Sequence, residues 1–176
     1  MPEKNGARMI AEGAAIAALY VVLTMVANAF GLANYAIQVR FSEALCILPL
    51  FTPSAIWGLF AGCVLANTLT GCLPLDTLFG SLATLSGALA LGMMARRMHL
   101  SPHSKMTCLL APLPNVIANT IVVPLVLTYV YRFEGSLPYF FVTVGAGEII
   151  SCYGFGVPLL LWVARNQGFL FQKNSF

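Results

Sequence analysis

The chain is built of long apolar stretches separated by short polar turns. The stretches cover residues 9–30, 42–51, 53–69, 76–95, 106–131 and 137–164. A helix needs about 20 predominantly apolar residues to cross a bilayer, and most of these stretches approach or exceed that length. We therefore predict an all-α integral membrane protein with six transmembrane helices in a single domain over residues 1–176.

Prolines interrupt two of the predicted helices. The second stretch stops near Pro53, and the fifth contains Pro112, Pro114 and Pro124. Proline removes a backbone donor and breaks or kinks a helix. Irregular backbone at membrane depth must be buried in protein or line a cavity, so this pattern favours a pocket over a plain membrane anchor.

Composition agrees with a bilayer as the solvent. The 176 residues are 59% hydrophobic and 9% charged, and the mean hydropathy is +0.86. A soluble domain carries about 25% charged residues, so this chain has too few charges to cover a water-facing surface. The net charge is +3, and the basic residues form no block that would indicate a nucleic-acid partner.

The basic residues also predict the orientation. With a cytoplasmic N-terminus, seven of the nine Lys and Arg fall inside, and Arg40 and Arg132 fall outside. Cytoplasmic loops carry an excess of Lys and Arg, so we expect both termini in the cytoplasm.

The first apolar stretch exceeds the roughly 7–15 residues of a signal-peptide core and contains Glu12, which favours a retained helix. Glu12 is expected to pair with Arg8, four residues earlier.

Polar residues occur within several of the apolar stretches. A rise of about 1.5 Å per residue places Glu43, Asn67, Asn119 and Glu148 at similar depth, in the outer half of the membrane. Polar groups inside membrane spans are costly and usually functional. The candidate substrate-binding residues are Glu148, Glu43, Asn119, Arg40, Asn67, Asn115 and Gln38.

Most of these residues also have a structural interpretation. Arg40 and Glu43 can pair at i, i+3, Asn67 can cap a helix, and Asn115 can hydrogen-bond to a neighbouring helix. Glu148 is harder to explain, because no Lys or Arg lies within a helical turn of it. It must be protonated, paired across helices, or matched by a ligand. Arg40 is the cation that would satisfy Glu148 without a ligand.

Two carboxylates and several amides suit a ligand that is rich in N–H donors. A guanine-like edge offers adjacent N–H and NH₂ groups, and Trp57, Tyr139 or Tyr153 can stack on a flat ring.

Motifs for an ATP phosphate loop, a zinc protease or a serine hydrolase are absent from the sequence. The five cysteines lack metal-ligand spacing. We predict no catalytic residues, no metal and no enzyme activity, and we interpret the cysteines as small hydrophobic residues.

The first stretch also carries two pairs of alanines at i, i+4 spacing. These pairs are Ala11 with Ala15 and Ala14 with Ala18. Small residues at this spacing let helices approach closely. The face they form either packs inside the chain or docks on another membrane protein, and spacing does not separate these alternatives.

Five segments of the chain, RFSEAL, LPLFTP, LFGSLATL, APLPN and GEIISCY, together resemble the QueT family. The resemblance covers residues 11–164. Members of that family look like substrate-binding S components of energy-coupling factor (ECF) transporters, which are importers of the bacterial cytoplasmic membrane with six helices and cytoplasmic termini.

The resemblance implies uptake of a queuosine precursor, either 7-aminomethyl-7-deazaguanine or queuine. It implies a transmembrane coupling protein that docks on the alanine pairs and two ATPase subunits, so that ATP is used by the partners and this chain has no cofactor. Glu148 would bind the base edge, Glu43 and Asn119 would complete the hydrogen bonds, and Arg40 would fix Glu43 or contact the ring oxygen.

Two other functions stay open. One is a solitary ion-coupled carrier of a small polar heterocycle, with Glu148 as the proton site, although no inverted repeat is visible in the sequence. The other is an intramembrane enzyme.

Overall fold

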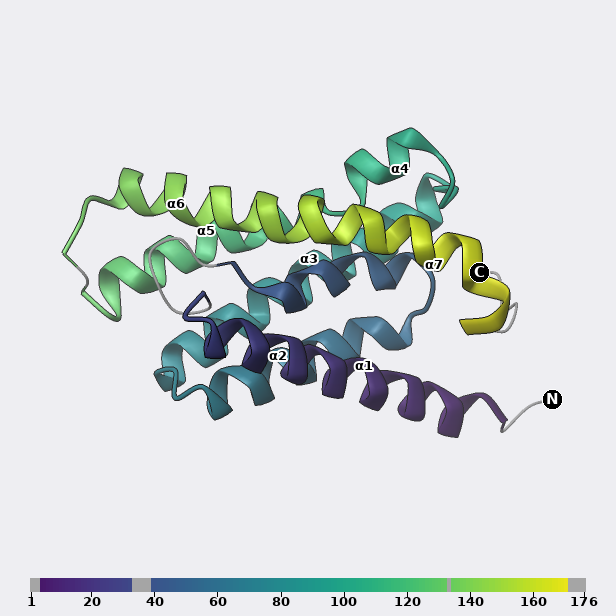
Figure 1. Ribbon diagram of the computed structural model, residues 1–176, viewed down its shortest axis with the longest axis horizontal. Coiled ribbons are helices and arrows are strands. Elements are labelled where there is room, and N and C mark those ends of the chain that lie inside the picture. Colours follow the sequence, from purple (N-terminus) through teal and green to yellow (C-terminus); the bar gives the residue numbers. More distant parts are fainter. Residues whose placement is uncertain (1–3, 33–38, 133, 171–176) are drawn as a thin grey trace.

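The computed structural model describes residues 4–32, 39–132 and 134–170, and every element in these ranges is helical (Figure 1). In chain order the elements are α1 (Lys4–Ala29), the 3₁₀ helix η1 (Phe41–Leu50), α2 (Ser54–Leu69), α3 (Pro74–Arg97), α4 (Lys105–Leu110), α5 (Leu113–Tyr129), α6 (Leu137–Ile149), the π-helix η2 (Ile150–Phe155) and α7 (Gly156–Leu170).

Four helical segments in the described ranges are long and apolar enough to cross a membrane. They are Gly6–Ala29, Pro74–Arg97, Lys105–Tyr129 and Leu137–Gly168. Two shorter apolar helices accompany them, Phe41–Leu50 and Ser54–Leu69. The all-α membrane class is confirmed, whereas six full crossings and the orientation of the termini stay predictions.

The fifth predicted helix is divided in the structure. α4 ends at Leu110, Pro112 is the N-cap of α5, and Pro114 lies in the first turn of α5. A proline is tolerated in a first helical turn because its missing N–H has no intrahelical partner there. Pro124 lies inside α5, which continues through it. The predicted break thus occurs at the first prolines of this stretch.

η1 occupies the centre of the bundle and contacts α1, α2, α3, η2 and α7 (Figure 1). All of its residues except Phe41 are buried. A helix that is apolar all round is typical of a core segment. η1 therefore acts as an internal helix that carries Glu43 into the middle of the protein.

Glycines allow α1 and α2 to pack at close range. A Cβ atom at Gly58 would lie 2.6 Å from the carbonyl oxygen of Gly13, and one at Gly62 would lie 2.7 Å from the Cβ of Tyr20. Such contacts leave no room for a larger residue. The close approach fixes the position of Tyr20, which is 1% exposed.

We expect Gly62→Ala to destabilise the protein by about 1–3 kcal/mol, because the added methyl group must push α1 away from α2. Thermal unfolding of the purified protein in detergent measures the effect. Gly154→Ala is the matched control, since a Cβ there meets nothing within 4 Å. Equal melting temperatures for the two variants would contradict the expected close packing.

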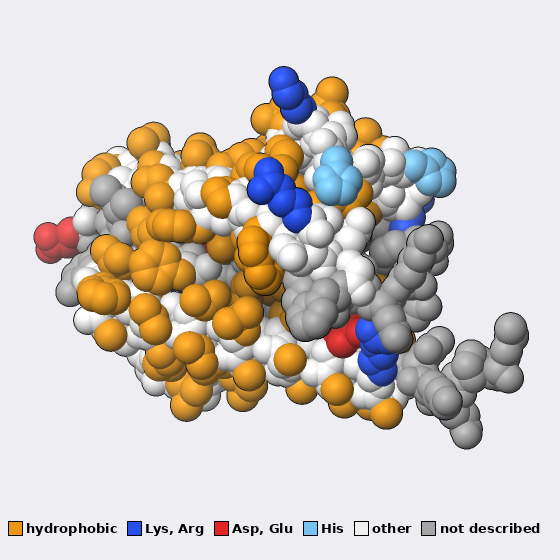
Figure 2. All heavy atoms as spheres, turned by 45° about the vertical axis from the view of Figure 1, so that its right-hand side comes forward, with side chains coloured by type: hydrophobic (Ala, Val, Ile, Leu, Met, Phe, Trp, Pro, Cys, Tyr) orange, Lys and Arg blue, Asp and Glu red, His pale blue; other side chains and the backbone are white. Residues whose placement is uncertain are grey.

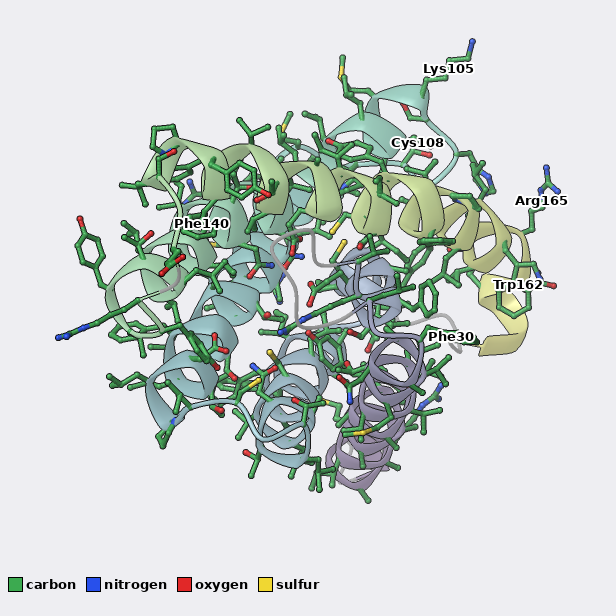
Figure 3. All side chains as sticks on the ribbon, turned by 60° about the vertical axis from the view of Figure 1, so that its left-hand side comes forward. Phe30, Lys105, Cys108, Phe140, Trp162 and Arg165 are labelled. Atoms are coloured by element: carbon green, nitrogen blue, oxygen red, sulfur yellow. The ribbon has the colours of Figure 1, made fainter. Side chains whose placement is uncertain are left out.

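Charge is distributed unevenly along the bundle. α1 begins and α7 ends at the same end of the molecule (Figure 1). Figure 2 shows Lys, Arg and His side chains gathered toward this end, while hydrophobic side chains cover the flank. Lys105 and Arg165 point away from the helices there (Figure 3). An apolar flank with a basic end is the surface expected of a membrane-embedded bundle.

Candidate polar pocket

Polar side chains from five helical elements converge on one buried pocket. In Figure 3, nitrogen and oxygen atoms gather between the helices near the centre of the view. The pocket is lined by residues of η1, α2, α3, α5 and α6 and by the residue before η1: Arg40, Glu43, Cys63, Asp76, Gly80, Thr84, Asn119, Val123 and Glu148. The structure thus brings four of the predicted site residues, Arg40, Glu43, Asn119 and Glu148, into one pocket.

Glu43 uses both of its carboxylate oxygens within the protein. The hydroxyl of Tyr20 donates to Oε1 at 2.5 Å, and Nδ2 of Asn115 donates to Oε2 at 2.8 Å. Glu43, which is 3% exposed, therefore ties α1 and α5 to η1. The predicted residue Asn115 is brought to Glu43 and does not itself line the pocket.

Glu148 is also buried, at 7% exposed, but it receives fewer strong hydrogen bonds than Glu43 within the described residues. Its described hydrogen bond comes from the thiol of Cys152, with Sγ 3.5 Å from Oε2. The same Sγ lies 3.6 Å from the backbone oxygen of Glu43, and its single hydrogen can serve one acceptor at a time. A thiol is a weak donor, so Glu148 keeps capacity to accept hydrogen bonds.

Glu43, Glu148 and Cys152 form a compact cluster in which the side-chain ligand atoms lie within 4.8 Å of one another. Two carboxylates and a thiol at this spacing have the chemistry to hold a metal ion. The prediction that this chain binds no metal therefore stays a prediction.

Arg40 links the start of η1 to two neighbouring elements. Its Nη1 donates to Oδ1 of Asn67 at 3.1 Å, and its backbone N–H donates to the hydroxyl of Ser151 at 3.1 Å. Asn67 is 1% exposed and uses its side-chain oxygen for Arg40, whereas the backbone N–H of Thr70 closes the end of α2. Asn67 therefore supports a pocket residue instead of capping its helix.

Asn119 lies on α5 one turn after Asn115 and is 4% exposed. Its Nδ2 atom is buried and has no hydrogen-bond partner among the described residues. Asn119 lines the pocket together with Glu148. Asn119 thus lies in the pocket wall with an amide donor that has no hydrogen bond among the described residues.

The sequence interpretation missed several contributors to this region. Tyr20 lies in an apolar stretch, where nothing in the pattern distinguishes it from a lipid-facing residue. Cys152 follows Glu148 by four residues, and this spacing places two side chains on one helix face. The interpretation of Cys152 as a purely hydrophobic residue was therefore incomplete, and the spacing was the signal that could have corrected it.

Asp76 was also missed as a pocket residue. Leu73 is the N-cap of α3, and Asp76 lies in the first turn. Its Oδ2 accepts a hydrogen bond of 2.8 Å from the hydroxyl of Tyr131, which in turn accepts from the backbone N–H of Leu73 at 3.1 Å. Burial raises the pKa of Tyr131, and the Asp76 carboxylate raises it further. This contact joins the α2–α3 turn to the segment after α5.

The predicted stacking residues do not meet in the pocket. Trp57 is 63% and Tyr139 is 51% exposed, so these two predictions were wrong. The hydroxyl of Tyr153 donates to a backbone oxygen in α4 at 2.7 Å. Gln38 lies outside the described residues. Within the described residues, Tyr20 is an aromatic side chain that reaches a pocket carboxylate, that of Glu43.

The four alanines of the first helix are exposed. Ala11, Ala14, Ala15 and Ala18 face away from the chain's own core, while Tyr20 on α1 packs against α2. The alternative that these alanines pack inside the chain is therefore excluded. Docking on another membrane protein stays a prediction.

Glu12 has the structural role expected from its spacing. Its Oε1 pairs with Nε of Arg8 at 2.8 Å, and its Oε2 accepts from the hydroxyl of Thr52 at 3.0 Å. This carboxylate joins α1 to the turn after η1.

The sequence model of the family described as "QueT transporter" matches residues 10–165. The match includes the exposed alanines of α1 and every residue that lines the pocket. No curated protein and no solved structure matches the chain significantly.

Proposed function

Because the chain belongs to the QueT transporter family, we propose that it is the substrate-binding S component of an ECF importer for a 7-deazaguanine queuosine precursor. The family and the apolar helices make the chain a multi-pass membrane protein that transports a small molecule. Our proposal adds the substrate, 7-aminomethyl-7-deazaguanine or queuine, and the partners, a coupling protein and two ATPase subunits in the bacterial cytoplasmic membrane.

The observation that carries the proposal is the buried pocket with two carboxylates and an open amide. Glu43 and Glu148 come from different elements, and Asn119 lies in the same pocket. Burying such groups in a membrane protein is costly unless they bind a partner. A planar base with N–H donors and a ring carbonyl would supply a donor to Glu148 and an acceptor to the Asn119 amide.

The position of the pocket suits capture from outside the cell. Asp76, Gly80 and Thr84 lie in the first half of α3, whereas the basic residues Arg96 and Arg97 lie in its last turn. If the basic end is cytoplasmic, the pocket lies in the outer half of six membrane crossings. The subunit would then bind substrate outside and reorient in the bilayer, and its partner ATPases would drive release.

The ATPases would act through the coupling protein. The exposed alanines of α1 offer that protein a flat surface for close helix packing. We expect Ala15→Phe to abolish ATP-dependent uptake and leave substrate binding unchanged, because the larger ring fills this surface. The matched control is Val142→Phe on α6, where Val142 is 71% exposed. Uptake by reconstituted vesicles and calorimetric binding measure the two effects.

Unchanged uptake by the Ala15→Phe variant would contradict docking at this surface.

The alternative function, a solitary ion-coupled carrier, is tested separately. The chain alone is reconstituted in vesicles and subjected to a proton gradient, and uptake without ATPase or coupling subunits would overturn the ECF assignment.

The substrate is tested by calorimetry of the purified chain with 7-deazaguanines, guanine and common vitamins. We expect the 7-deazaguanines to bind most tightly. Tight binding of an unrelated vitamin would overturn the substrate assignment. Conversion of the substrate by the chain alone would indicate an enzyme.

A further inference from the structure

The pocket contains one amide donor with no hydrogen-bond partner. Six side-chain N or O atoms in the described residues are buried without a partner, and Nδ2 of Asn119 is the one that belongs to a pocket-lining residue. The other five are hydroxyl oxygens of Ser and Thr. A buried amide without a partner is unfavourable, so this atom points to a ligand that carries an acceptor.

The two pocket carboxylates, Glu43 and Glu148, differ in the hydrogen-bond donors that the protein supplies to them. Both oxygens of Glu43 are engaged by Tyr20 and Asn115. Glu148 has the thiol of Cys152 at 3.5 Å as its described donor. Glu148 is therefore the carboxylate that is available to a ligand, whereas Glu43 is held by the protein.

Glu148, the open acceptor, and Asn119, the open donor, lie on two helices that pack against each other. α5 and α6 pack closely near these residues, since a Cβ at Gly145 would lie 3.3 Å from Cγ2 of Thr120. Asn119 precedes Thr120, and Glu148 follows Gly145 by three residues, which is nearly one turn. Both side chains line the same pocket. The Asn119 amide is also near the Glu148 carboxylate, so an acceptor and a donor face the pocket side by side from adjacent helices.

We propose that Glu148 and Asn119 together recognise a lactam edge, in which a ring N–H donates to Glu148 and the adjacent C=O accepts from Nδ2 of Asn119. Glu43 is then a positioning residue that fixes η1 through Tyr20 and Asn115 and makes no direct contact with this edge. This assignment rests on the proposed function and adds to it the feature of the substrate that the pocket selects.

The pair would reject the corresponding amino-substituted ring. An exocyclic NH₂ in place of the C=O directs a donor at the Asn119 donor, and the ring nitrogen without hydrogen directs an acceptor at Glu148. Both mismatches leave buried polar groups unpaired. Sites that hydrogen-bond a substrate group reject analogues without it far more strongly than apolar pockets reject a missing methylene.

The test compares 7-deazaguanine with 2,6-diamino-7-deazapurine, which differ at this edge alone. Calorimetry of the purified full chain is expected to show a preference of roughly 100-fold or more for the oxo ligand. Asn119→Leu should reduce this preference about 10-fold, mainly through weaker binding of the oxo ligand. The preference is a ratio of dissociation constants for one preparation, so partial unfolding of the variant does not alter it.

Thr143→Val is the matched control outside the pocket lining. The Thr143 hydroxyl already donates to the backbone oxygen of Tyr139 at 3.0 Å, so its loss should leave the preference unchanged. A preference that is the same in Asn119→Leu and in the unaltered chain would overturn the inference alone. If Asn119→Leu does not fold, equal or tighter binding of the amino ligand by the unaltered chain would also overturn it. Failure of both ligands to bind would overturn the proposed function together with the inference.

Discussion

Replacing Glu148 with glutamine is expected to weaken substrate binding by on the order of 1.5–3 kcal/mol, the typical contribution of a hydrogen bond to a charged group. This corresponds to a dissociation constant raised roughly 10- to 150-fold. Glutamine keeps the shape and one acceptor oxygen of Glu148 but replaces the second oxygen with an NH₂ donor. Because Glu148 has one weak thiol donor within the described residues, the effect should fall on the ligand and leave the fold intact.

Calorimetric titration of the purified variant with 7-deazaguanine measures this effect. Glu12→Gln is the matched control, because Glu12 is a carboxylate already paired with Arg8 and Thr52 on α1. We expect its affinity for substrate to equal that of the unaltered chain. An unchanged affinity in the Glu148→Gln variant would remove Glu148 from the binding site.

Replacing Glu43 with leucine is expected to destabilise the protein itself by roughly 2–5 kcal/mol. The change leaves the Tyr20 hydroxyl and the Asn115 amide buried without their acceptor, and each such group costs about 1–3 kcal/mol. Because these bonds join α1 and α5 to η1, the loss should also disorganise the pocket. The expected fall in melting temperature is about 5–15 °C.

Thermal unfolding in detergent measures the loss, and Glu43→Gln provides the control. A glutamine can accept from Asn115 and donate to the oxygen of Tyr20, so it should retain most of the stability. Equal destabilisation by both substitutions would show that charge matters more than hydrogen-bond pairing. A Glu43→Leu variant as stable as the unaltered chain would contradict the structural role of Glu43.

The membrane class followed from the sequence because it depends on composition and on the length of apolar stretches. Those quantities are local, and they are sufficient to predict helices when the solvent is hydrocarbon. The same local pattern did not show that η1 is a buried 3₁₀ helix at the centre of the bundle. Its burial results from contacts with five other elements, which no window of sequence contains.

The candidate site was predictable in part. Glu148, Glu43 and Asn119 stood out because polar residues are rare in apolar stretches, and the structure places them in one pocket. Tyr20 was not predictable, since its role depends on an acceptor 23 residues away. Trp57 was predicted near the ligand because it is aromatic, but the side of a helix that faces lipid is set by neighbouring helices. It is 63% exposed.

It follows from the amino-acid sequence alone that this chain is a helical membrane protein with costly polar groups in its apolar stretches. Hydrophobic length and the rarity of charge are sufficient for that conclusion. The different environments of the two carboxylates become evident only in the folded protein. Glu43 is satisfied by α1 and α5, while the hydrogen-bond donor to Glu148 among the described residues is a thiol. The difference lies in which donors the folded helices bring within about 3 Å, and spacing along a single chain does not contain that information.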